Sequence, residues 1–294
     1  MKKTRTSSYL MMIGAMLIYG TIGIFRRYIP FSSGMLAFVR GILGSVCLLL
    51  FTRLKKHRFA RGVPRRTIAL LVLAGGLMGF NWIVLFEAYE YTSVATATLC
   101  YYMEPTILIL LSPLLFREKL TARKLVCVLL SLGGMVLVSG VTEGGIGRGD
   151  LRGVALGLLA AVLYAAVVIL NKLLPLDDAY EKTIVQLSSA AVVLIPYLLL
   201  TEQPMTEPVT GAAVGMLVIV GVVHTGLAYA LYFTGMAGLE AQSIAVLSYI
   251  DPVSALILSA LILGEGLTPA GLVGAVLIIG ASLLCELRPR KKAS

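Results

Sequence analysis

The sequence has few charged residues: Asp, Glu, Lys and Arg make up 14% of its 294 positions, whereas hydrophobic residues make up 58%. A soluble globular domain carries about 25% charged residues. The mean hydropathy of +0.92 also lies far above the value of such a domain. This composition excludes a soluble globular protein, and the chain is therefore expected to be an integral membrane protein.

Cysteines and catalytic motifs are also scarce. The four cysteines, Cys47, Cys100, Cys127 and Cys285, fall in apolar stretches at scattered spacings, which excludes a disulfide framework and a zinc motif. The glycine-rich segment 140–150 lacks the Lys-Ser/Thr ending of a phosphate-binding loop. With no metal-ligand cluster and no pair of nucleophile and base, we expect neither an enzyme nor a cofactor.

Long apolar runs are abundant. A membrane-spanning helix needs about 20 apolar residues, and the sequence contains ten such windows. They cover residues 10–29, 33–51, 67–89, 93–115, 123–140, 153–170, 183–200, 211–233, 241–263 and 270–287. The predicted fold is an all-α integral membrane protein with ten transmembrane helices.

Basic residues are distributed unevenly between the connecting segments. Most lie in 2–5, 53–66, 117–124, 172–182 and the tail after Leu287. Because Lys and Arg are retained on the cytoplasmic side, both termini are predicted to be cytoplasmic in the plasma (inner) membrane. Anionic lipid headgroups account for the net charge of +10. Nucleic-acid binding is not expected, because the most basic segment, 53–66, contains no aromatic residue that could stack on bases apart from Phe59.

The chain repeats itself. Shifted by 147 positions, "YMEPTILILLSPLLFREKLT" (102–121) aligns with "YIDPVSALILSALILGEGLT" (249–268), and Tyr102 then meets Tyr249. A weaker match at an offset of 145 relates residues 19–30 to 164–175. Each half holds five spans, an odd number, so the second half must be inverted relative to the first. We predict a first repeat over 1–142, a connector over 143–152, and an inverted second repeat with a basic cytoplasmic tail over 153–294.

These motifs resemble the EamA-type branch of the drug/metabolite transporter superfamily. The resemblance rests on the acid-proline pairs at 104–105 and 251–252, on "REKLT" (117–121) and "GEGLT" (264–268), and on "GGMVLVSG" (133–140). Arg40 in the second span is also similar to the family's pattern, although its repeat counterpart here is Gln186. The resemblance implies alternating-access transport of small organic molecules, most often efflux, through a central cavity between the halves.

Two acids lie near the middle of predicted spans. Glu104 and Asp251 each reach the bilayer midplane, where a charge costs about 2.5–3.5 kcal/mol and usually faces a cavity or a partner. The prolines that follow them free the carbonyls of Tyr101 and Ser248. A carboxylate beside free carbonyls suits a proton or an organic cation. The alternative is that the acids are protonated or paired with Arg40 and only hold helices together.

Aromatic residues complete the predicted substrate site. Tyr101 lies one turn before Glu104, and Trp82 and Tyr229 occupy equivalent positions in the third and eighth spans; such rings bind organic cations. Tyr102 and Tyr249 precede the two acids and are included in the site. Packing is the alternative role for all these rings. Three further tyrosines near helix ends, Tyr9, Tyr89 and Tyr91, are assigned to packing or the membrane interface.

Two basic or titratable residues in the spans have open roles. Arg40 either binds a substrate carboxylate or neutralises Glu104. His224 either relays protons or donates a hydrogen bond to a nearby carbonyl. Glu118 and Glu265, which stand before Leu-Thr at helix junctions, are assigned to the structure of the hairpins, with gating as the alternative.

The sequence therefore predicts a secondary transporter that acts as a monomer in the lipid bilayer. In the sharper version, Glu104 and Asp251 exchange protons for an organic cation or amine during export, as in an antiporter. One alternative is an exporter or facilitator of amino acids or related metabolites, in which Arg40 takes the carboxylate. A membrane scaffold without transport is the remote alternative.

Overall fold

The computed structural model describes residues 5–57, 62–116, 121–138, 148–174, 178–201, 209–239 and 241–286. Within these ranges the chain forms helices joined by short turns, and they contain no strand. The first half contains α1 (Arg5–Gly20), α2 (Ile22–Arg27), α3 (Ser33–Leu54), α4 (Arg65–Tyr91), α5 (Val94–Tyr101), α6 (Glu104–Phe116) and α7 (Ala122–Val138). The second half contains α8 (Arg148–Leu173), α9 (Ala179–Thr201), α10 (Gly211–Gly221), η2 (Val222–Leu227), α11 (Ala228–Met236), α12 (Ala241–Ser248), α13 (Ile250–Leu258), η3 (Ser259–Leu263) and α14 (Pro269–Glu286).

Eight helical stretches among the described residues are long and apolar enough to cross a membrane. They are Thr6–Arg27, Ser33–Leu54, Arg65–Tyr91, Val94–Leu111, Leu151–Leu173, Ala179–Thr201, Gly211–Met236 and Val246–Leu263. The two remaining predicted spans correspond to shorter helices, α7 with 17 residues and α14 with its apolar part Pro269–Cys285. The prediction of an all-α multi-pass membrane protein is confirmed.

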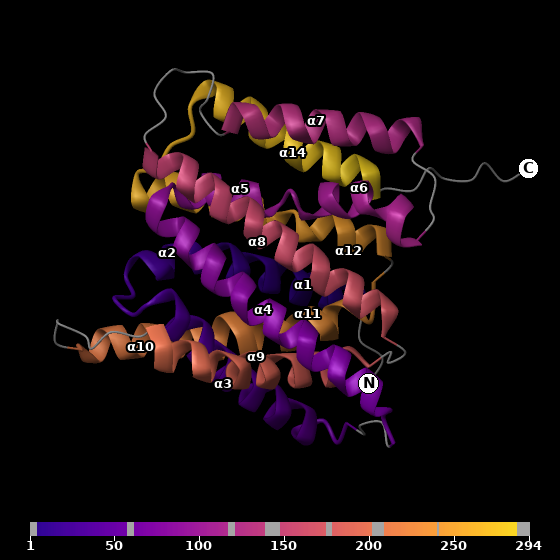
Figure 1. The fold of residues 1–294 in the computed structure, drawn as a ribbon, viewed down its shortest axis with the longest axis vertical. Helices are drawn as coiled ribbons and strands as arrows, with labels where there is room; N and C mark the ends of the chain where they lie inside the picture. Colours follow the sequence, from indigo (N-terminus) through magenta and orange to yellow (C-terminus); the bar gives the residue numbers. More distant parts are fainter. Residues whose placement is uncertain are drawn as a thin grey trace, which may run out of the picture.

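The packing of the helices repeats when the two halves are exchanged. α3 packs against α9, and α7 packs against α14, so equivalent spans of the two halves meet. α4 packs on α8 as α11 packs on α1, and α5 packs on α8 as α13 packs on α1. Figure 1 shows α7 and α14 side by side at one end of the molecule, with α3, α9 and α10 at the other. Five spans per half and this symmetric packing describe two inverted repeats.

The fourth and ninth spans are interrupted just before their prolines. α5 ends at Tyr101 and α6 begins at Glu104, while α12 ends at Ser248 and α13 begins at Ile250. Each break is tightened by a short backbone bond, from the Met103 amide to the Cys100 carbonyl (3.1 Å) and from the Tyr249 amide to the Val246 carbonyl (3.3 Å). Proline lacks the amide that would continue the helix, which explains both breaks.

Three predicted segments fall partly or wholly outside the described residues. The predicted connector covers 143–152, whereas α8 already begins at Arg148, and residues 143–147 lie outside the described residues. Glu118 and the tail after Glu286 also lie outside it. The domain boundaries therefore stay predictions.

Candidate functional site

A cavity of about 670 Å³ lies between the two halves. Its lining includes both midplane acids, Glu104 and Asp251, together with Arg40. It also includes the five rings predicted from the sequence, Trp82, Tyr101, Tyr102, Tyr229 and Tyr249. Eight of the nine predicted site residues thus face one space, although they come from five different spans.

The two helix breaks meet at the acid side of this cavity. The Tyr102 hydroxyl donates a hydrogen bond to the Asp251 carboxylate over 2.8 Å, which joins the first half to the second. The Tyr102 and Tyr249 ring centroids lie 6.3 Å apart. Gly20 of α1 approaches so closely that a Cβ there would lie 2.9 Å from the Asp251 carbonyl oxygen and 1.9 Å from the Ser254 hydroxyl. Only glycine fits at this contact.

Arg40 is fixed by an aromatic ring and a hydroxyl. Its guanidinium carbon lies 4.1 Å from the centroid of Trp82 and 5.6 Å from that of Phe86. Its Nε donates to the Thr225 hydroxyl over 2.9 Å, and that hydroxyl donates to the Val220 carbonyl. Thr225 belongs to η2, a π-helical turn, and such turns concentrate at functional sites.

Two consequences follow for the roles predicted for Arg40 and Trp82. Among the described residues Arg40 forms no ion pair with Glu104 or Asp251, so the pairing of the acids with Arg40 is not observed. The guanidinium also stands over the Trp82 ring, so that an organic cation would have to use the tyrosines instead.

Three tyrosines that line the cavity, Tyr19, Tyr164 and Tyr232, were not predicted from the sequence. Tyr19 and Tyr164 both line it, and they contact predicted members: Tyr19 lies 5.8 Å from Tyr229 and Tyr164 lies 5.5 Å from Tyr101 between ring centroids. The signal was present, because Tyr19 and Tyr164 are the first residues of the weaker repeat at an offset of 145. Neither is close to a charged residue in the sequence.

Tyr89, which is expected in packing or at the membrane interface, is 3% exposed and packs in the buried core, with its ring centroid 6.4 Å from that of Phe86. It also lines the cavity, which the sequence did not indicate. The fourth span folds back against the third at this level, and the Tyr89 and Thr98 hydroxyls lie 3.4 Å apart. Proximity to a helix end in the sequence did not reveal this contact.

His224 does not line the cavity. It is 2% exposed, and its Nε2 lies 2.8 Å from the Thr21 hydroxyl, at the break between α1 and α2. That hydroxyl already donates to the Ile18 carbonyl over 2.7 Å, so it accepts from a protonated Nε2. The ring packs edge-on against Phe25. In this arrangement His224 ties the first span to η2.

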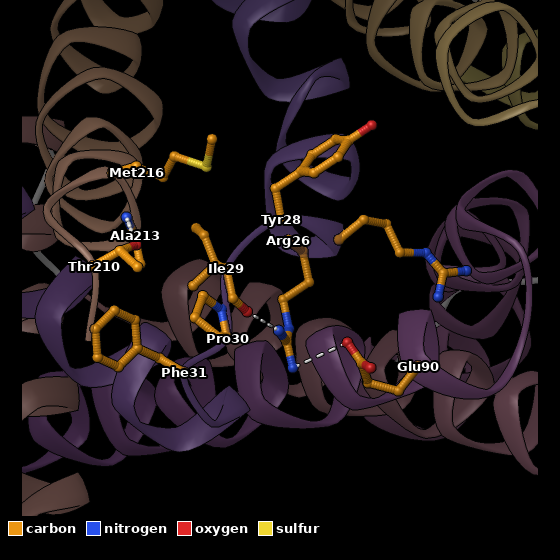
Figure 2. A pocket seen from close by; sticks show the side chains of 11 residues that line it. Arg26, Tyr28, Ile29, Pro30, Phe31, Glu90, Thr210, Ala213 and Met216 are labelled. Carbon is orange, nitrogen blue, oxygen red and sulfur yellow. Dashed lines mark hydrogen bonds and ion pairs between the residues drawn. The ribbon is translucent and has the colours of Figure 1, made fainter. Parts of the chain in front are cut away.

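A second, smaller cavity of about 430 Å³ lies away from the predicted site. Figure 2 shows that Arg26 points toward the Ile29 carbonyl and the Glu90 carboxylate at its edge. Arg26 is 7% exposed, and its Nη2 lies 3.1 Å from Glu90. The positive charge of Arg26 is therefore paired with Glu90, which belongs to the same half.

A multi-pass helical membrane protein with two inverted halves, and with a cavity between them that is lined by acids, an arginine and tyrosines, has the architecture of a transporter. The comparisons with known proteins agree. The EamA-like transporter family matches residues 6–140 and 151–286, once in each half. The chain belongs to this family and is a membrane transporter.

Individual relatives carry the same description. The chain is 27% identical to "Uncharacterized transporter YxxF" of Bacillus subtilis, over 99% of this chain and 93% of that protein. It is 26% identical to "Uncharacterized inner membrane transporter YicL" of Salmonella typhimurium, over 100% of this chain and 99% of that protein. A crystal structure aligns with a TM-score of 0.66 at 21% identity, over 96% of this chain and 97% of that one, which shows a shared fold.

Proposed function

We propose that this transporter exports an organic cation or amine by alternating access and exchanges it for protons at Glu104 and Asp251. The observation that carries the proposal is the shared cavity, because both midplane acids line it together with a ring of tyrosines. Carboxylates placed inside a membrane protein usually serve a substrate or ion path. Tyrosine faces attract cations when water is excluded.

The position of the acids supports coupling between substrate and protons. Each acid stands at a break in its span, and each break belongs to a different half. The contact from Tyr102 to Asp251 crosses between the halves, so a change in the charge of Asp251 acts directly on their interface. Binding at such a contact can bias a transporter toward one of two arrangements.

A second candidate is the export of amino acids or related metabolites. It is favoured by Arg40, whose guanidinium lines the same cavity and is held in place by Trp82 and Thr225. A fixed guanidinium recognises a carboxylate well. In this version Arg40 binds the substrate carboxylate.

Solid-supported-membrane electrophysiology on proteoliposomes separates the two candidates. Organic cations, zwitterionic amino acids and neutral metabolites are perfused with and without a proton gradient. For the first candidate we expect amine currents that fall at least about tenfold in Glu104→Gln and Asp251→Asn, the factor that 1.4 kcal/mol of binding supplies.

The control is Glu90→Gln, which removes a carboxylate outside the cavity and should leave the currents unchanged. Unchanged rate and unchanged pH dependence in both acid variants contradict the first candidate. Currents confined to amino acids and lost in Arg40→Gln support the second.

A further inference from the structure

Glu265 follows the end of the ninth span and is bound to that end. η3 ends at Leu263 and is followed by Gly264, which has a φ of +68°. This value lies in the left-handed region that glycine favours, and it turns the chain away from the helix axis. The Glu265 amide then donates to the Ser259 carbonyl over 3.2 Å. The Ser259 hydroxyl donates to Glu265 Oε2 over 2.8 Å. The carboxylate is thereby held in one orientation at the end of the span.

From this position the carboxylate crosses to the first half. Glu265 Oε1 lies 2.7 Å from Arg27 Nη2 at the end of α2. Oε2 accepts a hydrogen bond from the Val94 amide over 2.8 Å. Val94 is the first residue of α5, and the first amides of a helix have no partner within the helix. Arg27 completes the link by donating to the Thr92 carbonyl over 2.9 Å.

One carboxylate therefore joins the ends of three spans, and two of these spans belong to the other half. The Arg27 and Glu265 side chains are only 26% and 21% exposed, so water screens their attraction weakly. Charge-assisted hydrogen bonds of this kind are the stronger ones in proteins. Opening this face of the molecule would break all of them together.

The central cavity extends toward the opposite face. Its lining includes Asn171 and Ala179, which flank the connection between α8 and α9, and does not include Arg27 or Glu265. Helices alternate in direction, so the connection from α8 to α9 and the connection from η3 to α14 lie on opposite faces. Figure 1 shows α2 at the left of the molecule, while α8 runs from the upper left toward the lower right.

The neighbouring arginine provides a contrast. Arg26 binds Glu90, the Ile29 carbonyl and the Ser33 hydroxyl, and all of these residues belong to the first half. Figure 2 shows Arg26 directed to Glu90 and Ile29. Arg26 thus organises one half, whereas Arg27 binds across to the other. The carboxylate partner of Arg26, Glu90, therefore serves as a matched control for Glu265, the carboxylate partner of Arg27.

We infer that Glu265 is a positioning residue for transport: with Arg27 and the Val94 amide it forms a latch that holds this face closed, while the cavity is reached from the opposite face. The inference rests on the proposed alternating-access function. On the predicted orientation the latch lies on the outer side of the membrane. Its release is the step that exposes the cavity to that side.

Thiol labelling tests the latch without any substrate. The four native cysteines are replaced by alanine, and Thr98→Cys is introduced as a reporter, because Thr98 lines the cavity one turn inside Val94. A membrane-impermeant maleimide is added from the outer side of intact cells. With the latch intact we expect slow labelling, and with Glu265→Gln an increase in rate of about tenfold, as expected for the loss of a charge-assisted bond.

Two further variants make the result specific. Arg27→Gln should also speed labelling. Arg27→Lys should label nearly as slowly as the parent, because the positive charge is kept. Glu90→Gln, which removes a carboxylate from the same face but only from the first half, should leave the rate unchanged. All variants are first checked for an unchanged melting temperature in detergent.

The latch is rejected if folded Glu265→Gln labels at the parent rate, or if Glu90→Gln speeds labelling as much as Glu265→Gln does. Either result would leave the transport proposal standing, because the labelling measurement needs no transported substrate. If the parent protein gives no substrate currents, but the variants show the labelling rates expected for the latch, the result counts against the proposed function alone.

Discussion

At the scale of single residues, the central cavity depends on a few fixed side chains. Arg40 is the clearest case, since a guanidinium that is 6% exposed needs a partner for each donor that water cannot reach. The Trp82 ring lies against its face, and Thr225 accepts from its Nε. Thr225 thus provides the acceptor that keeps Arg40 in one place.

We predict that Thr225→Val destabilises the protein. The valine keeps the shape of the side chain but leaves the Arg40 Nε without its acceptor, and an unsatisfied buried donor costs about 1–3 kcal/mol. The melting temperature in detergent should fall for Thr225→Val and stay near the parent value for Thr225→Ser, which keeps the hydroxyl. Equal melting temperatures for all three proteins would show that Arg40 does not depend on Thr225.

At the scale of helices, the pair α7 and α14 shows how the two halves meet at one end. The backbones touch through glycines: a Cβ on Gly134 would lie 2.6 Å from the Gly274 carbonyl oxygen, and a Cβ on Gly274 would lie 2.5 Å from the Gly134 carbonyl oxygen. Close backbone approach through small residues is a common way to pack membrane helices, which lack a hydrophobic driving force in lipid.

The adjacent glycine allows a controlled prediction. Gly133 has no atom within 4 Å of an added Cβ, so Gly133→Val should be tolerated, whereas Gly134→Val must push the two helices apart. Overpacking of this kind costs about 1–3 kcal/mol. The melting temperature should therefore fall in Gly134→Val and fall much less in Gly133→Val. A similar fall in melting temperature in both variants would show that the loss of stability does not come from the contact between α7 and α14.

At the scale of the whole molecule, the inverted repeat places equivalent features on opposite sides of the membrane. The two broken spans bring Glu104 and Asp251 to one cavity, and the hairpin after the ninth span carries the latch on one face. Asymmetry between the halves is as important as the symmetry. Arg40 has Gln186 as its repeat counterpart, and Gln186 donates to Asn171. The second half instead contributes Lys182, one turn before Gln186, to the lining of the cavity.

The predicted orientation can be tested with fusion reporters. The basic segments predict that both termini lie in the cytoplasm and that the connector between the halves lies outside. A fluorescent protein fused after Ser294 should therefore fluoresce, and alkaline phosphatase fused after residue 142 should be active. The reverse pattern would invert the orientation and would move the latch to the cytoplasmic face.

Several features of the site were predictable from the sequence, because they occur in both halves or because a charge inside an apolar span is unfavourable. The acid-proline pairs were found since a charge in an apolar span is rare and a proline interrupts a helix. Tyr101, Tyr102 and Tyr249 followed from their positions beside those pairs, and the rings at 82 and 229 followed from their equivalent positions in the repeat. Tyr19, Tyr164 and Tyr232 were missed because no charge marks them, and the position of Tyr89 near a helix end predicted packing or the membrane interface but not the cavity.

By itself, the sequence determined the membrane location, the all-helical class, the two halves and the two helix breaks, because hydropathy, repeat and proline act locally along the chain. Only the tertiary structure decided how the side chains around the cavity contact one another. It placed Arg40 on Trp82, His224 against Thr21 and Glu265 between Arg27 and Val94. These contacts join residues from 42 to 238 positions apart, and their geometry depends on how helices pack, which local sequence patterns do not specify.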